Sequence, residues 1–324
     1  MATAGKFRVP TPQWVWRTTI VLLGILIMCI GTLAALGARQ PSDAGTFATP
    51  FAENSPWRQR IPPNPMIDPN SAAMIAAVQP RPALASNLVE FGIPIYRASA
   101  DDPTYALNCT QADWGVCPLA GWEVMIPDGA APHVGSDHAL VTVDERRGLV
   151  FELWQAARSG DQWSASWGGV NDLDGSGWGG AGTGSGASRL AGVIRLSEIA
   201  AGDIPHALAL QTNNACGTFR PPALVSDGKS TRADCIPQGA RLQLDPALDL
   251  SELDLTPGEL AVATAMQRYG GYVMDSGGAP LSASFELDTH AAPGTVGATY
   301  EAAGFRWDYD AMEHVPWEML RVLN

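Results

Sequence analysis

The sequence predicts a mainly β protein, a jelly roll or β-sandwich domain with a few short helices, preceded by one N-terminal transmembrane helix. Short runs of alternating apolar and polar residues are separated by turns rich in Gly and Pro, of which the chain has 34 and 25. Strands do not alternate repeatedly with long helices, which argues against doubly wound and barrel α/β folds. One long uncharged segment lies near the N-terminus.

That uncharged segment, residues 18–38, is long enough to cross a bilayer core of about 30 Å as a helix. Basic residues precede it and only Arg39 follows closely, so the positive-inside rule places residues 1–17 in the cytoplasm. A signal peptide cleaved after Gly37 is the alternative, although the segment exceeds the usual apolar length of about 7–15 residues. The sequence therefore predicts a single-pass cell-membrane protein with an extracellular C-terminal domain, or a secreted protein after cleavage.

The exported part is predicted to have two sections. Residues 39–82 are rich in Pro, Ala, Ser and Asn, as in a linker, but Phe51 and Trp57 are too apolar for a free tether. We therefore expect a Pro-rich linker that becomes a clamp across the domain surface, with a short helix at 69–78. Residues 83–324 form the predicted extracytoplasmic β-rich domain.

The clearest local pattern is a β-hairpin. Alternating runs at 138–143 and 149–154 flank a polar turn at 144–148. A turn centred on Arg146 would place residues 138, 140 and 142 on one face with residues 150, 152 and 154. Further strands are predicted at 191–196, 206–211 and 240–244, and helices at 197–201 and 257–269, the latter capped by Thr256.

Charge excludes several functional classes. Asp and Glu number 33 against 20 Lys and Arg, for a net charge of -13, so no basic surface is available to bind nucleic acid. Lysine occurs only at Lys6 and Lys229, which argues against Schiff-base chemistry and against a P-loop.

Four cysteines follow the predicted membrane segment, in a compartment that permits oxidation: Cys109, Cys117, Cys216 and Cys235. We expect two disulfides. Three pairings are possible, and pairing of near neighbours would close two short loops. A zinc site is the alternative, but the spacing is not C-x-x-C.

The hairpin carries the first candidate for chemistry. The predicted register brings Asp137, His138, Glu152 and Trp154 together, and a carboxylate and an imidazole beside an indole can transfer a proton to a stacked substrate. Alternatively, Trp154 fills the core and His138 forms a structural pair with Glu152.

Two further residues could complete an acid/base pair with Glu152. His206 opens an apolar strand, and Asp275 follows the strand-like segment 272–274. Each could instead have a purely structural role.

Tryptophan is unusually frequent, with 11 Trp against 6 Tyr and 8 Phe. Trp154, Trp163, Trp167 and Trp178 are close in sequence, and indole faces can stack on sugar rings. Trp163 and Trp167 could equally form one buried strand face. The sequence thus offers a glycan-binding strip with Asp137 beside it.

The glycine-rich segment 168–188 is predicted to be a mobile loop beside the sheet. Asp172 and Asp174, followed by Gly175, resemble half of a calcium loop. The later ligands of such a loop are missing, so a plain turn is favoured, and no cofactor is predicted.

An ordered set of segments resembles a family of exported bacterial proteins, chiefly actinobacterial, that has no established activity. The segments are FAENSPWR (51–58), IDPNSAAM (67–74), GSDHALVTVD (135–144), FELWQA (151–156), LAGVIRLSEIAAG (190–202), IPHAL (204–208), PQGARL (237–242) and YGGYVMD (269–275). The similarity runs from Phe51 to the C-terminus. The resemblance implies that six candidates belong to the family's motifs: Asp137, His138, Glu152, Trp154, His206 and Asp275.

Together these patterns predict an exported, membrane-tethered carbohydrate-active enzyme of the cell envelope. In a glycoside hydrolase, Glu152 would transfer the proton and Asp275 would be the second carboxylate. Trp154 would lie under the sugar ring, and His138 would tune or orient Glu152. In a polysaccharide lyase, His138 or His206 would be the base, and Arg195 or Arg241 would neutralise a uronate. The alternative is a non-catalytic glycan-binding or structural surface protein, and in each case the partner is a polysaccharide or cell-wall glycan.

Overall fold

The computed structural model describes residues 45–78 and 84–324, which belong to one compact unit, Ala44–Asn324. The cytoplasmic segment 1–17 and the transmembrane segment 18–38 of the sequence prediction lie outside the described residues. Within the described ranges, no helix has both the length and the apolar character needed to span a bilayer.

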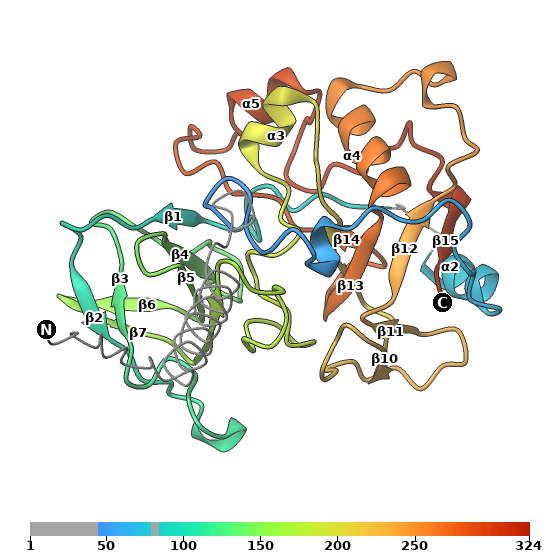
Figure 1. The fold of residues 1–324 in the computed structure, drawn as a ribbon. Coiled ribbons are helices and arrows are strands. Elements are labelled where there is room, and N and C mark those ends of the chain that lie inside the picture. Colours follow the sequence, from blue (N-terminus) through green and yellow to red (C-terminus); the bar gives the residue numbers. More distant parts are fainter. Residues whose placement is uncertain (1–44, 79–83) are drawn as a thin grey trace, which may run out of the picture. The chain divides into compact units, whose positions relative to one another are not determined.

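The unit is mainly β, with 26% strand and 16% helix, and its helices are short (Figure 1). This confirms the predicted fold class, whereas the finer assignment to a jelly roll or sandwich stays a prediction. A four-stranded sheet has the order β1 (Ile95–Arg97), β4 (Leu140–Asp144), β5 (Leu149–Trp154), β8 (Trp167–Asp172). A five-stranded sheet has the order β14 (Ser282–Ala283), β9 (Leu208–Thr212), β13 (Gly271–Ser276), β12 (Arg241–Leu244), β15 (Leu320–Val322).

Both sheets are mixed. β1 pairs with β4, and β9 with β13, in parallel, and the other neighbours run antiparallel. Small ribbons complete the strands: β2 (Thr104–Ala106) with β3 (Glu123–Met125), β6 (Ala157–Ser159) with β7 (Gln162–Ser164), and β10 (Ala215–Phe219) with β11 (Ile236–Gln238). The helices are α2 (Ser71–Val78), α3 (Leu196–Ala201), α4 (Pro257–Arg268) and α5 (Ala298–Ala302), with short 3-10 turns η1 (Pro56–Arg58), η2 (Ala112–Trp114), η3 (Leu250–Glu252) and η4 (Trp317–Met319).

One apolar cluster joins the two sheets. Val141, Val143 and Val150 from the four-stranded sheet pack in the same cluster as Ala209 and Tyr272 from the five-stranded sheet. The opposite face of each sheet has its own core: α4 covers β12 and β13 (Figure 1), and the ribbons β2/β3 and β6/β7 with Leu119 cover β4 and β5. Burying apolar surface on both faces is the main force that holds these layers together.

Residues 45–78 contribute to the cores of this unit. Phe51 and Trp57 are each 1% exposed, and Trp57 stacks on Trp178 with ring centroids 5.1 Å apart. Met66, another apolar residue of the same Pro-rich segment, is by contrast 71% exposed. The predicted helix at 69–78 is α2, which begins two residues later than expected.

The hairpin forms, but its register differs by one residue from the prediction. Val141 lies opposite Glu152, and Asp144 opposite Leu149, so the connecting loop has four residues and is not centred on Arg146. The side chain of Asp144 sets this loop by accepting hydrogen bonds from the amides of Arg146 and Arg147, both at 3.1 Å. As a result, His138 precedes the strand and does not share a face with Glu152.

Two other expectations need correction. Residues 168–172 are not loop but most of β8, which pairs with β5 along its whole length. Residues 191–196 do not form a strand: the chain turns at 190–193, and only Ile194 makes an isolated bridge, to Phe285. The predicted strands at 206–211 and 240–244 correspond to β9 and β12.

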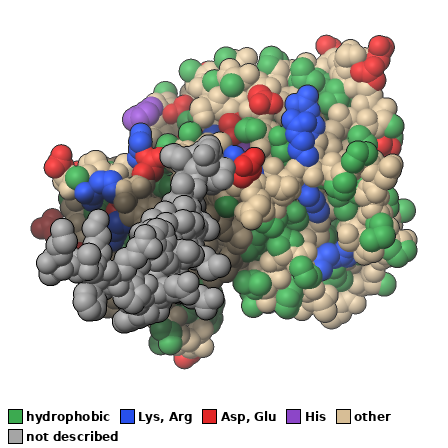
Figure 2. Space-filling model, in the orientation of Figure 1, with side chains coloured by type: hydrophobic (Ala, Val, Ile, Leu, Met, Phe, Trp, Pro, Cys, Tyr) green, Lys and Arg blue, Asp and Glu red, His purple; other side chains and the backbone are tan. Residues whose placement is uncertain are grey.

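The surface is chemically mixed. On the face drawn in Figure 2, the basic side chains of the described residues occur singly or in small groups among acidic and apolar ones. This face therefore carries interspersed charges of both signs.

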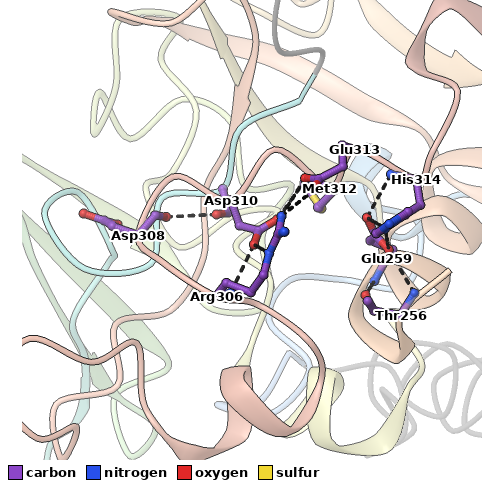
Figure 3. Close-up of polar contacts among 9 residues, drawn as sticks. Thr256, Glu259, Arg306, Asp308, Asp310, Met312, Glu313 and His314 are labelled. Carbon is purple, nitrogen blue, oxygen red and sulfur yellow. Dashed lines mark hydrogen bonds and ion pairs between the residues drawn. The ribbon is translucent and has the colours of Figure 1, made fainter.

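Helix α4 begins with the predicted cap (Figure 3). Thr256 Oγ1 accepts a hydrogen bond from the Glu259 amide at 3.3 Å, and Glu259 Oε2 accepts one from the Thr256 amide at 2.9 Å. Glu259 Oε1 also accepts a hydrogen bond from the His314 amide at 3.1 Å, which ties the helix start to the C-terminal segment.

We predict that Thr256→Ala lowers the free energy of unfolding by about 1 kcal/mol, because the cap is lost at a helix that covers the five-stranded sheet. Urea unfolding followed by tryptophan fluorescence measures the change. The control is Thr295→Ala, whose hydroxyl bonds only the Ala292 carbonyl in an exposed turn; it should change stability by less than about 0.5 kcal/mol. Equal effects of the two substitutions would contradict the capping role.

Candidate functional site: two cavities around Asp137, Arg189 and Asp275

Two neighbouring cavities, with volumes of about 570 and 640 Å³, open to solvent. Both are lined by Asp137, Arg189 and Asp275, here called the central trio, and by Ser276. Each volume lies in the range of about 300–1,000 Å³ that is typical of ligand sites. The trio is therefore the charged centre of a two-part groove.

Three distant segments supply the trio. Asp137 lies in the turn before β4, Arg189 directly follows the glycine-rich loop, and Asp275 lies near the C-terminal end of β13. The pairing of β13 with β9 slips between Val273 and Asp275. Such irregularities re-aim side chains and are common next to active sites.

Arg189 lies between the two carboxyl groups. Its Nη1 is 3.8 Å from Asp137 Oδ2, and its Nη2 is 3.6 Å from Asp275 Oδ2. Asp137 Oδ1 also accepts a hydrogen bond from Trp154 Nε1 at 3.1 Å, and Asp275 Oδ1 accepts one from the Gly184 amide at 3.3 Å. One guanidinium thus forms ion pairs with two acids, one through each terminal nitrogen.

The two acids have different surroundings. Burial raises the pKa of Asp275 to about 7, with Asp227 and Asp137 adding to the rise and Arg189 opposing it. The side chain of Asp275 is 16% exposed, against 38% for Asp137. A carboxyl group with a pKa near neutrality can donate a proton at physiological pH.

Glu152 lies outside the groove and lines neither cavity. It is 1% exposed, and its Oε1 accepts hydrogen bonds from the Ser188 hydroxyl and from Asn171 Nδ2. Burial raises the pKa of Glu152, against the opposing effect of Ser188 and Arg189. Oε2 is buried without a hydrogen-bond partner. Glu152 thus connects β5 to the residue that precedes Arg189.

Glycines let the loop lie directly on this sheet. A Cβ atom at Gly182 would be 1.6 Å from Glu152 Oε2, and one at Gly169 would be 2.4 Å from the Gly180 carbonyl oxygen. Ser185 and Ser188 in this loop are fully buried. The glycine-rich segment, predicted to be mobile, is therefore packed against β8 and β5.

Stacked indoles form one wall of the larger cavity, here called the aromatic cavity. Trp114 stacks on Trp154 with ring centroids 5.3 Å apart and an interplanar angle of 22°, and it meets Trp167 edge-on at 5.7 Å. Leu224, Val225 and Asp227 line the same cavity. Trp163, also predicted as a sugar platform, is buried in the core below the ribbons.

The smaller cavity, here called the polar cavity, carries amide and hydroxyl groups. Its lining includes Asn87, Gln211, Ser282 and Ser284. His133 also lines it, and burial lowers the pKa of this imidazole to about 4, so it is neutral at pH 7.

The two predicted catalytic histidines do not enter the groove. His138 has a φ of 39° and its Nδ1 lies 3.3 Å from the His133 carbonyl oxygen. His206 precedes β9, at the end opposite Asp275, and its Nε2 is 3.1 Å from the Glu198 carboxylate. Burial alone would lower the pKa of His206, but Glu198 raises it above its ordinary value.

The disulfide prediction is confirmed, and near neighbours pair: Cys109 with Cys117, and Cys216 with Cys235. The first loop carries Trp114, and the second carries Leu224, Val225 and Asp227. Each disulfide therefore closes one wall of the aromatic cavity.

The turn that resembles half of a calcium loop, and the two arginines considered for a uronate, do not line either cavity. Asp172 ends β8 and Asp174 lies in the following turn, and within residues 45–78 and 84–324 no group of three or more His, Cys, Asp or Glu is arranged to hold a metal ion. Arg195 pairs with Glu286 at 2.8 Å. Arg241 donates to the Tyr269 carbonyl oxygen at 2.8 Å.

Three groove residues have little signal in the sequence: Trp114, Arg189 and Asp227. Arg189 could have been noticed as a cation at the end of the glycine-rich segment in a chain with few cations. Trp114 lies inside the first disulfide loop, and Asp227 inside the second. Loop positions of this kind reveal their neighbours only in the folded chain.

Comparison with known proteins found no matching family model, no similar curated protein and no similar solved structure.

We predict that Gly182→Ala destabilises the fold by about 1–3 kcal/mol, because the new methyl group overlaps Glu152 Oε2 and the loop must move. Gly278→Ala is the matched control, since its Cβ would meet no atom within 4 Å. Urea unfolding of both variants measures the difference. If Gly182→Ala unfolds like Gly278→Ala, the loop does not pack on Glu152 as described.

Proposed function

We propose that the groove hydrolyses a glycan of the cell envelope. One observation carries the proposal: a largely buried carboxyl with a pKa of about 7, Asp275, shares Arg189 with a second carboxyl, Asp137, beside stacked indoles. Glycoside hydrolysis needs two carboxyl groups in different environments, one to protonate the leaving oxygen and one to act on the opposite side of the sugar.

The environments suggest a role for each residue. Asp275 donates its proton to the glycosidic oxygen as the bond breaks. Asp137 is the second carboxylate and either activates the water or attacks the sugar. Arg189 holds both acids in place, and Trp154 with Trp114 supports a sugar ring.

This assignment changes both carboxyl roles of the sequence prediction, because Asp275 becomes the proton donor in place of Glu152 and Asp137 becomes the second carboxylate. Glu152 and His138 line neither cavity, so Asp137 takes the place of Glu152 next to Asp275. Glu152 instead positions the loop that leads to Arg189.

The charged side chains that line the groove favour hydrolysis over elimination. A lyase acting beside a uronate needs a cation that is free to neutralise the carboxylate. Arg189 is the only Lys or Arg among the described residues that line the two cavities, and it already faces two acids. The non-catalytic alternative, a glycan-binding surface protein, is supported by the stacked Trp114 and Trp154.

The two sheets are proposed to form a β-sandwich. The apolar cluster shared by both sheets supports this assignment. The parallel pairs β1/β4 and β9/β13 argue against a jelly roll, which is built from antiparallel strands.

We predict that Asp275→Asn lowers glycan cleavage by about 10²–10⁴-fold, because a general acid is removed. In the unsubstituted chain, activity should fall as the pH rises through about 7, where Asp275 loses its proton. Stability should fall as the pH rises from 3.8 to about 7, between the pKa values of the unfolded and folded states, and should level off above that range, because the folded state disfavours the ionised carboxyl. Unfolding is therefore measured at each pH.

The assay follows new reducing ends and the absorbance of unsaturated sugars over a panel of envelope and plant polysaccharides. Asp203→Asn is the control, because Asp203 lines neither cavity and its side chain is 65% exposed. Loss of no more than about threefold in Asp275→Asn would remove Asp275 from the reaction. Unsaturated products would favour a lyase, and binding without cleavage would favour the surface-protein alternative.

We also propose that the domain is exported and tethered by the N-terminal segment, as the two disulfides suggest. A reporter fused to the C-terminus should be active only outside the cytoplasm. The anchored chain should resist alkaline carbonate extraction, whereas release of a chain shortened by roughly the first 37 residues would show cleavage instead. Reporter activity in the cytoplasm would contradict export.

A further inference from the structure

We propose that the groove binds an uncharged oligosaccharide that occupies both cavities, so that the bond at the central trio is internal to the sugar chain. This inference rests on the proposed function and narrows its substrate class and mode of cleavage.

The position of the trio between the cavities is the first argument. Asp137, Arg189 and Asp275 line both spaces, and each space alone is large enough for a small ligand, at about 570 and 640 Å³. A glycosidic bond held at the trio therefore has room for sugar units on both sides. A site for terminal residues would instead be closed on one side of the acids.

The two cavities complement different parts of a sugar. Trp114 and Trp154 offer stacked aromatic faces, which suit the apolar C–H face of a pyranose ring. On the other side of the trio, Gln211 Nε2 donates to Ser284 Oγ at 2.8 Å and Asn87 Nδ2 donates to the Ala283 carbonyl oxygen at 3.2 Å. The remaining hydrogen-bonding capacity of these amide and hydroxyl groups can serve ring hydroxyls. One chain can thus be stacked on one side and hydrogen-bonded on the other.

Charge excludes acidic sugars. Among the described residues that line either cavity, Arg189 alone is a Lys or Arg, and it lies between two acids. Asp227 adds a further acid to the aromatic cavity, and His133 in the polar cavity is neutral at pH 7. The carboxylates of the groove would therefore repel the carboxylate of an acidic sugar, and no unpaired Lys or Arg among the described lining residues would neutralise it.

Binding is tested first, with the full chain carrying Asp275→Asn to prevent turnover. The probes are cello-, xylo- and chito-oligosaccharides of one to six units, and hexagalacturonate as the acidic probe, followed by tryptophan fluorescence. We expect affinity for at least one neutral series to increase with chain length beyond the units that one cavity can hold. Hexagalacturonate should bind roughly tenfold more weakly or worse.

Substitutions of residues that line each cavity show whether a bound oligosaccharide occupies both cavities. Gly278→Trp adds an indole at a residue that lines the polar cavity and has open space around its Cβ position, and Trp114→Ala removes a stacking face from the aromatic cavity. Each should weaken hexasaccharide binding by roughly tenfold or more. Ala200→Trp, on the exposed side of α3, is the matched control for an added indole. Asn87→Ala replaces Gly278→Trp if that variant does not fold.

The outcomes separate this inference from the proposed function. In the unsubstituted chain, the first cleavage products should be shorter oligosaccharides. If only monosaccharides are released, or if the polar-cavity variants bind hexasaccharide as tightly as the control, the inference is overturned while the hydrolase assignment stands. Preferred binding of hexagalacturonate also overturns it. If no probe binds, the inference is overturned, and the polysaccharide assay described above decides the hydrolase proposal separately.

Discussion

The groove depends on the hydrogen bonds made by one buried carboxyl group, that of Glu152. A carboxyl removed from water is expensive unless its oxygens are hydrogen-bonded. Here the Ser188 hydroxyl and the Asn171 amide satisfy one oxygen. The residue after Ser188 is Arg189, so the contact that compensates Glu152 also determines where the guanidinium emerges. The chain thus links a buried polar group in β5 to the geometry of two acids that it does not touch.

Local signals in the sequence predicted the local structure well. Thr256 and Glu259 mark the start of α4 because both halves of a capping box lie within four residues. Register was harder to predict because β4 is buried on both faces, and alternation then gives no information on which side each residue points. The four-residue loop at 145–148 decides the register, and its conformation depends on side-chain contacts of Asp144 that alternation does not reveal.

The site was predictable only where it coincides with strand ends and aromatic residues. Asp137, Trp154 and Asp275 could be selected because they lie next to β4, within β5 and near the end of β13. Arg189 and Trp114 could not, since loops bring them to the groove from positions far away in the sequence. The glycines were ambiguous for a related reason: the same composition suits a flexible linker and a backbone that must approach a sheet closely. Only the position of Gly182 against Glu152 distinguishes the two.

The pair of disulfides has a consequence for how such a groove can diversify. Each joins cysteines that are near in sequence, with separations of 8 and 19, and each loop projects from the sheets to form one wall. Because each loop is closed at its own base, its interior can change in composition or length without altering the pairing of β4 with β5 or of β9 with β13. The central trio lies outside both disulfide loops, whereas Trp114, Leu224 and Asp227 lie inside them and belong to replaceable inserts. Chemistry and selectivity are thus encoded in separate stretches of the chain, and evolution or an engineer can exchange one while keeping the other.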